Sequence, residues 1–231
     1  MNFKGKRLLV IASHPDDEIL GCGGLIGRVK EAGGQVYVLI VTVGSAELYG
    51  GNSNLDERVK ETKEVMKFIK ADDYEIAFPS DEHHLRLDML PQRTLIDLME
   101  SGSKVSLNKV KPDIIALPFF GSSNQDHRSV AQAALTACRP RPHDLKPFQS
   151  LALTYEEPLQ NNLLETFRPN FYVNLKGLLD FKCQALKLYK SQVKGPIHQC
   201  SPETITIMAQ SRGREVAIEA AEAFMLYRFL V

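Results

Sequence analysis

The segment His14–Glu18 places one imidazole and three carboxylates within five residues, one residue after the apolar run Leu8–Ala12. Folding gains nothing from this crowding, because like charges at short range repel and raise each other's pKa. Proteins accept it where a cation is bound or where acid–base chemistry takes place. His14–Glu18 is therefore the first candidate for a functional site.

A second polar cluster, Asn124–His127, follows the apolar run Asp113–Leu117 by a short loop. Ligands of an open parallel sheet sit at the carboxyl ends of its strands, so both clusters converge if their strands are neighbours. His14, one of the two aspartates and His127 would then form a two-histidine, one-carboxylate set. Such a set leaves a coordination position for water, as in catalytic zinc sites. The other aspartate is free to accept a proton from that water.

Helix capping is the alternative explanation for the aspartates. Asp16 or Asp17 could cap the helix that follows, and Asp126 could cap a helix that starts at Arg128. Capping would explain either cluster alone. It requires no histidine, however, and both clusters contain one, which favours the metal site.

The rest of the chain alternates between strand-like and helix-like segments. Strands are predicted over Arg7–Ala12, Gln35–Val43, Glu75–Phe78, Asp113–Leu117, Ser150–Tyr155 and Asn170–Asn174. Helices are predicted over Glu18–Ala32, Leu55–Lys70, Pro91–Val110 with an interruption near Gly102, Arg128–Cys138, Gly177–Ser191 and Pro202–Leu230. The alternation indicates an α/β, Rossmann-like fold with a mainly parallel sheet and helices on both faces.

Less regular segments follow the fourth strand. Residues 140–149 and 156–170 are rich in proline, asparagine and other polar residues, so we expect long loops there and an irregular C-terminal extension. Strand signals continue to about residue 174 without a linker, which favours one domain over residues 1–231. The run Gly21–Gly24 lacks the spacing of a dinucleotide fingerprint. Its small residues predict close packing of the helix against the sheet.

Composition narrows the function classes. The chain of 231 residues carries 28 basic and 28 acidic side chains without a basic block, which argues against a nucleic-acid-binding protein. The N-terminal apolar run is too short for a signal peptide or a membrane span, so we predict a cytoplasmic protein. Four scattered cysteines without a C-x-x-C pair indicate reduced thiols.

Together these motifs resemble the PIG-L/LmbE-like deacetylases, zinc-dependent enzymes that remove the N-acetyl group from glucosamine-type sugars. The family includes deacetylases of the mycothiol and bacillithiol pathways, and some members form trimers or hexamers. The resemblance covers nearly the whole chain and rests on the strand followed by H-P-D-D-E-x-L-G-x-G-G, and on Thr42–Gly44, Arg58-x-x-Glu61, Pro112–Ile115 and Asp126–Arg128.

The resemblance assigns roles to these residues. It implies that three of them bind the metal: His14, Asp17 and His127. Zinc is the family's metal, although such a set would also hold Fe²⁺, Co²⁺ or Mn²⁺. Asp16 would be the general base, and Arg58 would anchor the substrate. A solvated Arg58 paired with Glu61 is the alternative.

Asn124 stands where many relatives carry a histidine. Asparagine can donate a hydrogen bond to an oxyanion but cannot deliver a proton. Asp16 could therefore act as both base and acid, with Asn124 and Asp126 completing the catalytic group and Asp126 orienting local hydrogen bonds. Alternatively, the acid comes from a histidine elsewhere: His83, His84, His143 or His198.

Two further stretches, Arg86–Asp88 and Pro196–Ser201, resemble a branch of the family that is tied to sugar and antibiotic pathways. They make Arg86 and His198 candidate substrate contacts, although His198 in a surface loop is the simpler explanation. Cys200 occupies the position of an arginine in that branch.

The sequence thus predicts a metal-dependent N-deacetylase that acts on a small amino-sugar substrate, without a nucleic-acid partner or a membrane span. A homo-oligomer is possible. The alternatives are an amidase for a non-sugar or antibiotic-scaffold amide, and a sugar-binding relative without catalytic activity.

Overall fold

A mostly parallel sheet forms the centre of the molecule in the computed structural model, which describes residues 2–48, 51–158, 164–193 and 195–231. Its strands are β1 (Arg7–Ala12), β2 (Gln35–Val43), β5 (Asp73–Pro79), β6 (Ile114–Leu117), β7 (Leu151–Tyr155), β8 (Phe171–Asn174) and β9 (Ala221–Phe229). The helices are α1 (Asp17–Glu31), α2 (Leu55–Phe68), α3 (Gln92–Asp97), α4 (Leu107–Val110), α5 (Gln125–Ala137), α6 (Leu179–Lys187) and α7 (Pro202–Glu215). The strand order is β5-β2-β1-β6-β7-β9-β8.

The pairing of the strands places the ends of β1 and β6 beside each other. β1 pairs in parallel with β2 and β6, and β6 pairs in parallel with β7. β9 runs antiparallel between β7 and β8. The predicted mainly parallel sheet is therefore confirmed, and the two polar clusters follow adjacent strands.

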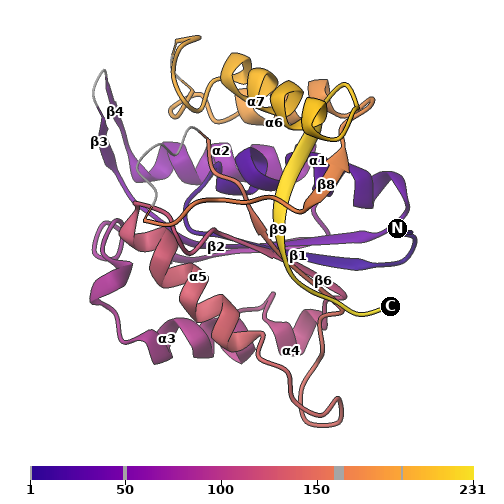
Figure 1. Cartoon of the computed structure of the whole chain (residues 1–231). Coiled ribbons are helices and arrows are strands. Elements are labelled where there is room, and N and C mark those ends of the chain that lie inside the picture. Colours follow the sequence, from indigo (N-terminus) through magenta and orange to yellow (C-terminus); the bar gives the residue numbers. More distant parts are fainter. Residues whose placement is uncertain (1, 49–50, 159–163, 194) are drawn as a thin grey trace.

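Helices cover both faces of this sheet (Figure 1). Along β1, Leu8 and Val10 pack into one core with residues of α1, α2 and α6. Leu9 and Ile11 point to the opposite face and pack with residues of α3, α4 and α5. Because each face of the central strands is buried, their sequences are almost continuously apolar. The predicted two-sided arrangement is confirmed.

The helix predicted over Pro202–Leu230 is wrong in its second half. Helix α7 ends at Glu215, the chain reverses through Ala217 with φ 58°, and β9 follows. Alanine, glutamate, methionine and leucine in this stretch favour a helix locally. Pairing of β9 on both edges, with β7 and β8, overrides that preference.

Other segments differ less from the prediction. The stretch Pro91–Val110 is divided into α3, a π-helical turn at Leu98–Gly102 and α4, so the interruption near Gly102 is confirmed. Residues 140–149 form a loop as predicted, and so do the described parts of 156–170; residues 159–163 lie outside the described residues. The short hairpin of β3 (Ala46–Leu48) and β4 (Gly51–Ser53) was not predicted.

A buried ion pair contacts the backbone of α1 where the glycines lie. The Glu222 carboxylate accepts hydrogen bonds from Gly24 N at 2.6 Å and Leu25 N at 2.7 Å. The ammonium group of Lys182 donates to Glu222 and to the Leu20 carbonyl, each at 2.7 Å. The two side chains thus bind backbone groups in the middle of α1. Such close approach needs glycine, which confirms the predicted close packing.

We expect the substitution Gly24→Ala to lower the free energy of unfolding by about 1–3 kcal/mol, the usual cost of overpacking a core. A Cβ atom at this position would overlap Leu175 and lie 3.0 Å from the Glu222 carboxyl group. Chemical denaturation measures the change. Gly195→Ala is the control, because a Cβ there meets nothing within 4 Å. Equal effects of the two substitutions would contradict the packing argument.

Candidate active site

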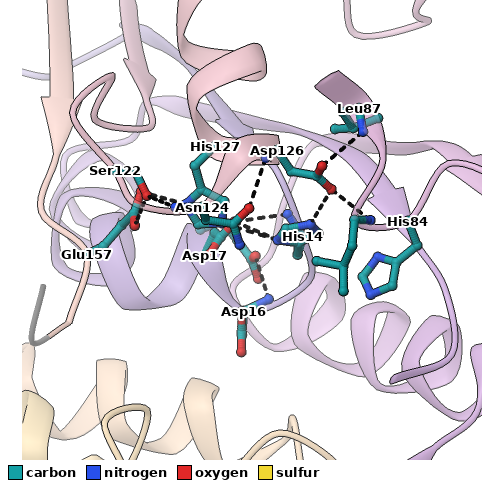
Figure 2. Close-up of polar contacts among 12 residues, drawn as sticks. His14, Asp16, Asp17, His84, Leu87, Ser122, Asn124, Asp126, His127 and Glu157 are labelled. Atoms are coloured by element: carbon teal, nitrogen blue, oxygen red, sulfur yellow. Dashed lines mark hydrogen bonds and ion pairs between the residues drawn. The ribbon is translucent and has the colours of Figure 1, made fainter. Parts of the chain in front are cut away.

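The two polar clusters meet at the carboxyl ends of β1 and β6 (Figure 2). His14 follows β1, and Asp17 is the first residue of α1. His127 lies in the first turn of α5, which follows β6. Helix α5 begins three residues earlier than predicted, so His127 is held by a helix and not by a loop.

Three side chains direct potential ligand atoms at one point. His14 Nδ1 lies 3.2 Å from His127 Nε2 and 3.9 Å from Asp17 Oδ2. His127 Nε2 lies 3.3 Å from Asp17 Oδ2. The three atoms lie within 4.8 Å of one another, and all three residues are buried. This is the set that the sequence predicted.

Each histidine is held from behind by a carboxylate. His14 Nε2 lies 2.9 Å from Asp126 Oδ2, and His127 Nδ1 lies 2.5 Å from Glu157 Oε1. A carboxylate behind a histidine fixes the tautomer and the orientation of a metal-ligating ring. When the ring protons face these carboxylates, His14 Nδ1 and His127 Nε2 are the nitrogens that face each other and Asp17.

The close approach of His14 Nδ1, His127 Nε2 and the Asp17 carboxylate favours a positive charge between them. Two lone pairs and a carboxylate this close repel one another unless a proton or a cation lies among them. Burial lowers the pKa of His127, but the carboxylates of Asp17 and Glu157 outweigh this effect and raise it to about 9. The residues present therefore fit a divalent metal ion bound by His14, Asp17 and His127, with ligand types that suit zinc.

Asp126 holds His14 in place and does not line the cavity beside it. Its buried carboxylate accepts hydrogen bonds from Leu85 N and Leu87 N, each at 2.9 Å, in addition to the contact with His14. Burial raises the pKa of Asp126, but the hydrogen bonds outweigh this and keep it below its usual value. Asp126 is thus an ionised positioning residue.

Asp16 occupies the N-cap position of α1 without capping the helix. Its φ of 97° is unusual for a residue other than glycine, and its side chain makes no capping hydrogen bond. Burial and then the neighbouring Asp17 carboxylate raise the pKa of Asp16 well above its usual value. The capping alternative is therefore wrong for Asp16, whose strained backbone presents a basic carboxylate to the cavity.

Asn124 caps α5, so the predicted capping role of Asp126 is wrong. Asn124 Oδ1 accepts a hydrogen bond from Asp126 N at 2.9 Å. Because the oxygen is engaged as the cap, the amide N–H groups of Asn124 remain available to donate.

A cavity of about 460 Å³ opens beside the three ligand residues. It is lined by Asp16, Asp17, Leu20, Gly21, Ser122, Ser123, Asn124, His127, Tyr155, Glu156, Glu157, Pro158, Gln199 and Cys200. This volume is in the range of pockets for small molecules. The cavity therefore joins Asp16 and two of the candidate metal ligands, Asp17 and His127, to a space for a substrate.

Arg58 lies outside that lining, in a buried contact with Gly44 and His84. Its Nη1 donates to Gly44 O at 2.8 Å and lies 3.0 Å from His84 Nε2. Gly44 leaves room for His84, because a Cβ there would overlap the His84 ring. The alternative of a solvated Arg58 paired with Glu61 is wrong: Arg58 is buried and Glu61 accepts from Ser191. An anchoring role for Arg58 stays a prediction.

The histidines proposed as alternative acids do not line the cavity. Burial, and then His14 and Arg58, lower the pKa of His84 to about 3, so it carries no proton to deliver at neutral pH. His83 stacks on Phe78, and His143 stacks on Phe148 in the 140–149 loop. Asp16 is left as the cavity residue suited to both proton transfers.

Two predicted substrate contacts lie outside the cavity lining. Arg86 is exposed and precedes the 3-10 turn Leu87–Met89. His198 is half-buried in a turn, where its Nδ1 accepts from Cys200 N at 3.2 Å. Its neighbours Gln199 and Cys200 line the cavity instead. Both substrate contacts stay predictions.

Glu157 is a site residue that sequence reasoning missed. It lies within the stretch predicted to be a loop, two residues after the end of β7. Its second oxygen accepts from Ser122 Oγ at 2.9 Å, so the carboxylate is fixed at both ends (Figure 2). Applying the carboxyl-end rule to β7, as to β1 and β6, would have identified it.

Fold and site together show an α/β protein with a buried His–Asp–His cluster that could hold a metal ion. A family model described as PIG-L, GlcNAc-PI de-N-acetylase, matches residues 9–138, and the chain belongs to this family. The resemblance noted in the sequence is confirmed. The uncharacterized deacetylase YaiS of Escherichia coli K12 is 26% identical over 194 residues, which cover 81% of this chain and 92% of the relative. A probable N-acetyl-α-D-glucosaminyl L-malate deacetylase 2 of Bacillus subtilis 168 is 22% identical, with coverage of 84% and 86%.

Solved structures share the fold over nearly the whole chain. A conserved protein of Thermus thermophilus has 25% identity and a TM-score of 0.75, with 98% of this chain and 96% of that chain covered. N,N'-diacetylchitobiose deacetylase of Pyrococcus horikoshii has 21% identity and a TM-score of 0.73, with coverage of 96% and 83%. GalB, a 4-carboxy-2-hydroxymuconate hydratase of Pseudomonas putida KT2440, also has a TM-score of 0.73 at 21% identity, with 98% of each chain covered. The fold alone therefore does not fix the reaction.

Proposed function

We propose that this chain is a metal-dependent N-deacetylase that hydrolyses the acetamide of an N-acetylglucosamine-type sugar or sugar conjugate to an amine and acetate. The observation that supports this most is the Asp16 carboxylate, which makes no capping hydrogen bond and shares a cavity with Asp17 and His127 of the His14–Asp17–His127 set. A binding protein without catalytic activity has no use for such a carboxylate.

In the proposed reaction, water adds to the acetyl carbonyl carbon and the C–N bond then breaks. A divalent ion held by His14, Asp17 and His127 would supply Lewis acidity, which lowers the pKa of water from about 15.7 to near neutrality. Asp16 accepts the proton of the attacking water. The amide N–H of Asn124 is free to donate to the oxygen that gains negative charge.

The leaving amine needs a proton before it departs. Asp16 holds the proton that it took from water, and its raised pKa suits both accepting and returning it. Among the described residues that line the cavity, His127 is the one histidine, and it is assigned to the metal. We therefore assign both proton transfers to Asp16.

Acetate release tests the proposal. The purified protein with zinc should release acetate from N-acetylglucosamine conjugates, lose this activity when a chelator removes the metal, and regain it when zinc is returned. Release from non-sugar amides but not from sugars would favour the amidase alternative. Sugar binding without release in the presence of zinc would favour the sugar-binding alternative.

Further predictions from the sequence join this proposal. Zinc is the proposed ion among Zn²⁺, Fe²⁺, Co²⁺ and Mn²⁺, and metal analysis after expression distinguishes them. Residues 1–231 are proposed to form one domain, because the seven strands outside the β3–β4 hairpin share one sheet, in which β1 and β9 both take part. Within the described residues, no helix is long and apolar enough to cross a membrane. The cytoplasmic location stays a prediction from the sequence, and a trimer or hexamer is proposed on the family resemblance alone.

A further inference from the structure

The cavity beside the metal ligands is acidic. Its described lining contains four carboxylate residues and no lysine or arginine; the acids are Asp16, Asp17, Glu156 and Glu157. A negatively charged part of a substrate would find no partner among these groups.

Basic side chains near the cavity lining are committed to other acceptors. Arg128 donates to the carbonyl oxygens of Ser122 and Ser123 at 2.8 and 2.7 Å. The Arg212 guanidinium binds the Glu156 carboxylate and donates to Glu215 at 2.6 Å. Lys182 is buried against α1, and Arg58 is buried against Gly44. Releasing any of them would leave a buried acceptor or carboxylate without its partner, which is costly.

The charge balance of the site is also negative. Four carboxylates surround the two ligand histidines: Asp16, Asp17, Asp126 and Glu157. With Asp16 ionised, as the proposed base must be, their combined charge exceeds the combined charge of one divalent cation and Arg58. In a cavity of low dielectric, this surplus repels an anionic substrate group and tolerates a neutral one.

Glu156 is held at the rim in one orientation. Arg212 Nε lies 3.1 Å from Oε1 and 2.9 Å from Oε2, and Arg212 is fixed in turn by Glu215, which accepts from Tyr172 at 2.8 Å. A carboxylate with two oxygens has further lone pairs available beyond this pairing. An immobilised acceptor of this kind suits the hydroxyl groups of a sugar or polyol.

Building on the proposed deacetylase function, we propose that the substrate joins the acetamido sugar to an uncharged, polyhydroxylated group. Glu156 accepts hydrogen bonds from hydroxyls of this substrate and favours it over conjugates that carry carboxylates. Cys200 and Gln199, both neutral, form the part of the lining that comes from the turn before α7.

Three conjugates of N-acetylglucosamine test this choice. The holoenzyme is assayed for acetate release from N,N'-diacetylchitobiose, from the myo-inositol conjugate and from the L-malate conjugate, which is dianionic at neutral pH. We expect kcat/KM for at least one neutral conjugate to exceed that for the malate conjugate by tenfold or more, that is, by at least about 1.4 kcal/mol. Equal or better turnover of the malate conjugate would overturn the inference and leave the deacetylase function standing. Absence of acetate from all three would overturn both.

Substitutions at Cys200 and Glu156 test whether these residues determine the preference for neutral over anionic conjugates. Cys200→Arg adds a cation to the lining and should raise the ratio of malate to neutral turnover at least fivefold, whereas Cys200→Ala should leave that ratio unchanged. If Cys200→Arg fails to fold, Gln199→Lys at an exposed position makes the same test. Glu156→Gln should raise KM for neutral conjugates more than it lowers kcat. An unchanged ratio in the cationic variants, or an unchanged KM in Glu156→Gln, would overturn the assignment.

Discussion

Replacing Asp16 with asparagine is expected to lower kcat for acetate release by about 10²–10⁴-fold, the usual contribution of a general acid–base residue. Asparagine keeps the size of the side chain but cannot accept a proton. It also tolerates the left-handed backbone that Asp16 adopts, with φ 97°, better than most residues. The fold should therefore persist while the chemistry stops.

Metal content and the pH profile separate this effect from damage to the site. Asp16→Asn should bind the same amount of metal as the parent protein, because Asp16 is outside the ligand set. The acidic limb of the kcat/KM profile should disappear with the base that causes it. Asp144→Asn, in the exposed 140–149 loop, is the matched control. A variant at position 16 that keeps more than half of the parental kcat would assign the base elsewhere.

Replacing Glu157 with alanine is expected to weaken metal binding by about 10–100-fold, the typical effect of losing the carboxylate behind a ligand histidine. The change removes the partner of His127 Nδ1 and the acceptor for Ser122. His127 would then lose both the fixed orientation of its ring and the charge that makes its nitrogen a good donor. Competition with a metal-binding dye measures the affinity.

Glu157→Gln separates charge from geometry, because the amide oxygen can still accept from His127. Its affinity should fall between those of the parent and of the alanine variant. Glu64→Gln, exposed on α2, removes a charge away from the site and should change nothing. An alanine variant whose affinity stays within twofold of the parent would show that Glu157 is dispensable for the metal.

The core of the site was predictable because topology determines it. His14–Glu18 and Asn124–His127 each follow an apolar run, and parallel pairing of β1 with β6 brings the carboxyl ends of these runs together. His14 and the two aspartates of the H-P-D-D-E motif lie where this rule places them, and so does His127. Family resemblance then separated base from ligand, which residue spacing alone did not.

The parts that escaped prediction depend on contacts between distant segments. Glu157 acquires its role only when β7 brings it to His127, 30 residues away in the sequence. The strand β9 has a helix-forming composition and becomes extended only between β7 and β8. Asn124 was predicted to be a catalytic residue, and its capping of α5 through the side-chain oxygen was not predicted. Local patterns carry no information about such partners.

The pairing of Glu222 with the backbone of α1 has a consequence for the order of assembly during synthesis. Residues 221–229 are synthesised long after α1, and this strand must pair with β7 and β8 before Glu222 can reach Gly24 and Leu25. The helix that carries Asp17 therefore gains its final packing only after Glu222 has been synthesised. A nascent chain that contains His14, Asp17 and His127 but not yet Glu222 would lack part of the framework that holds them.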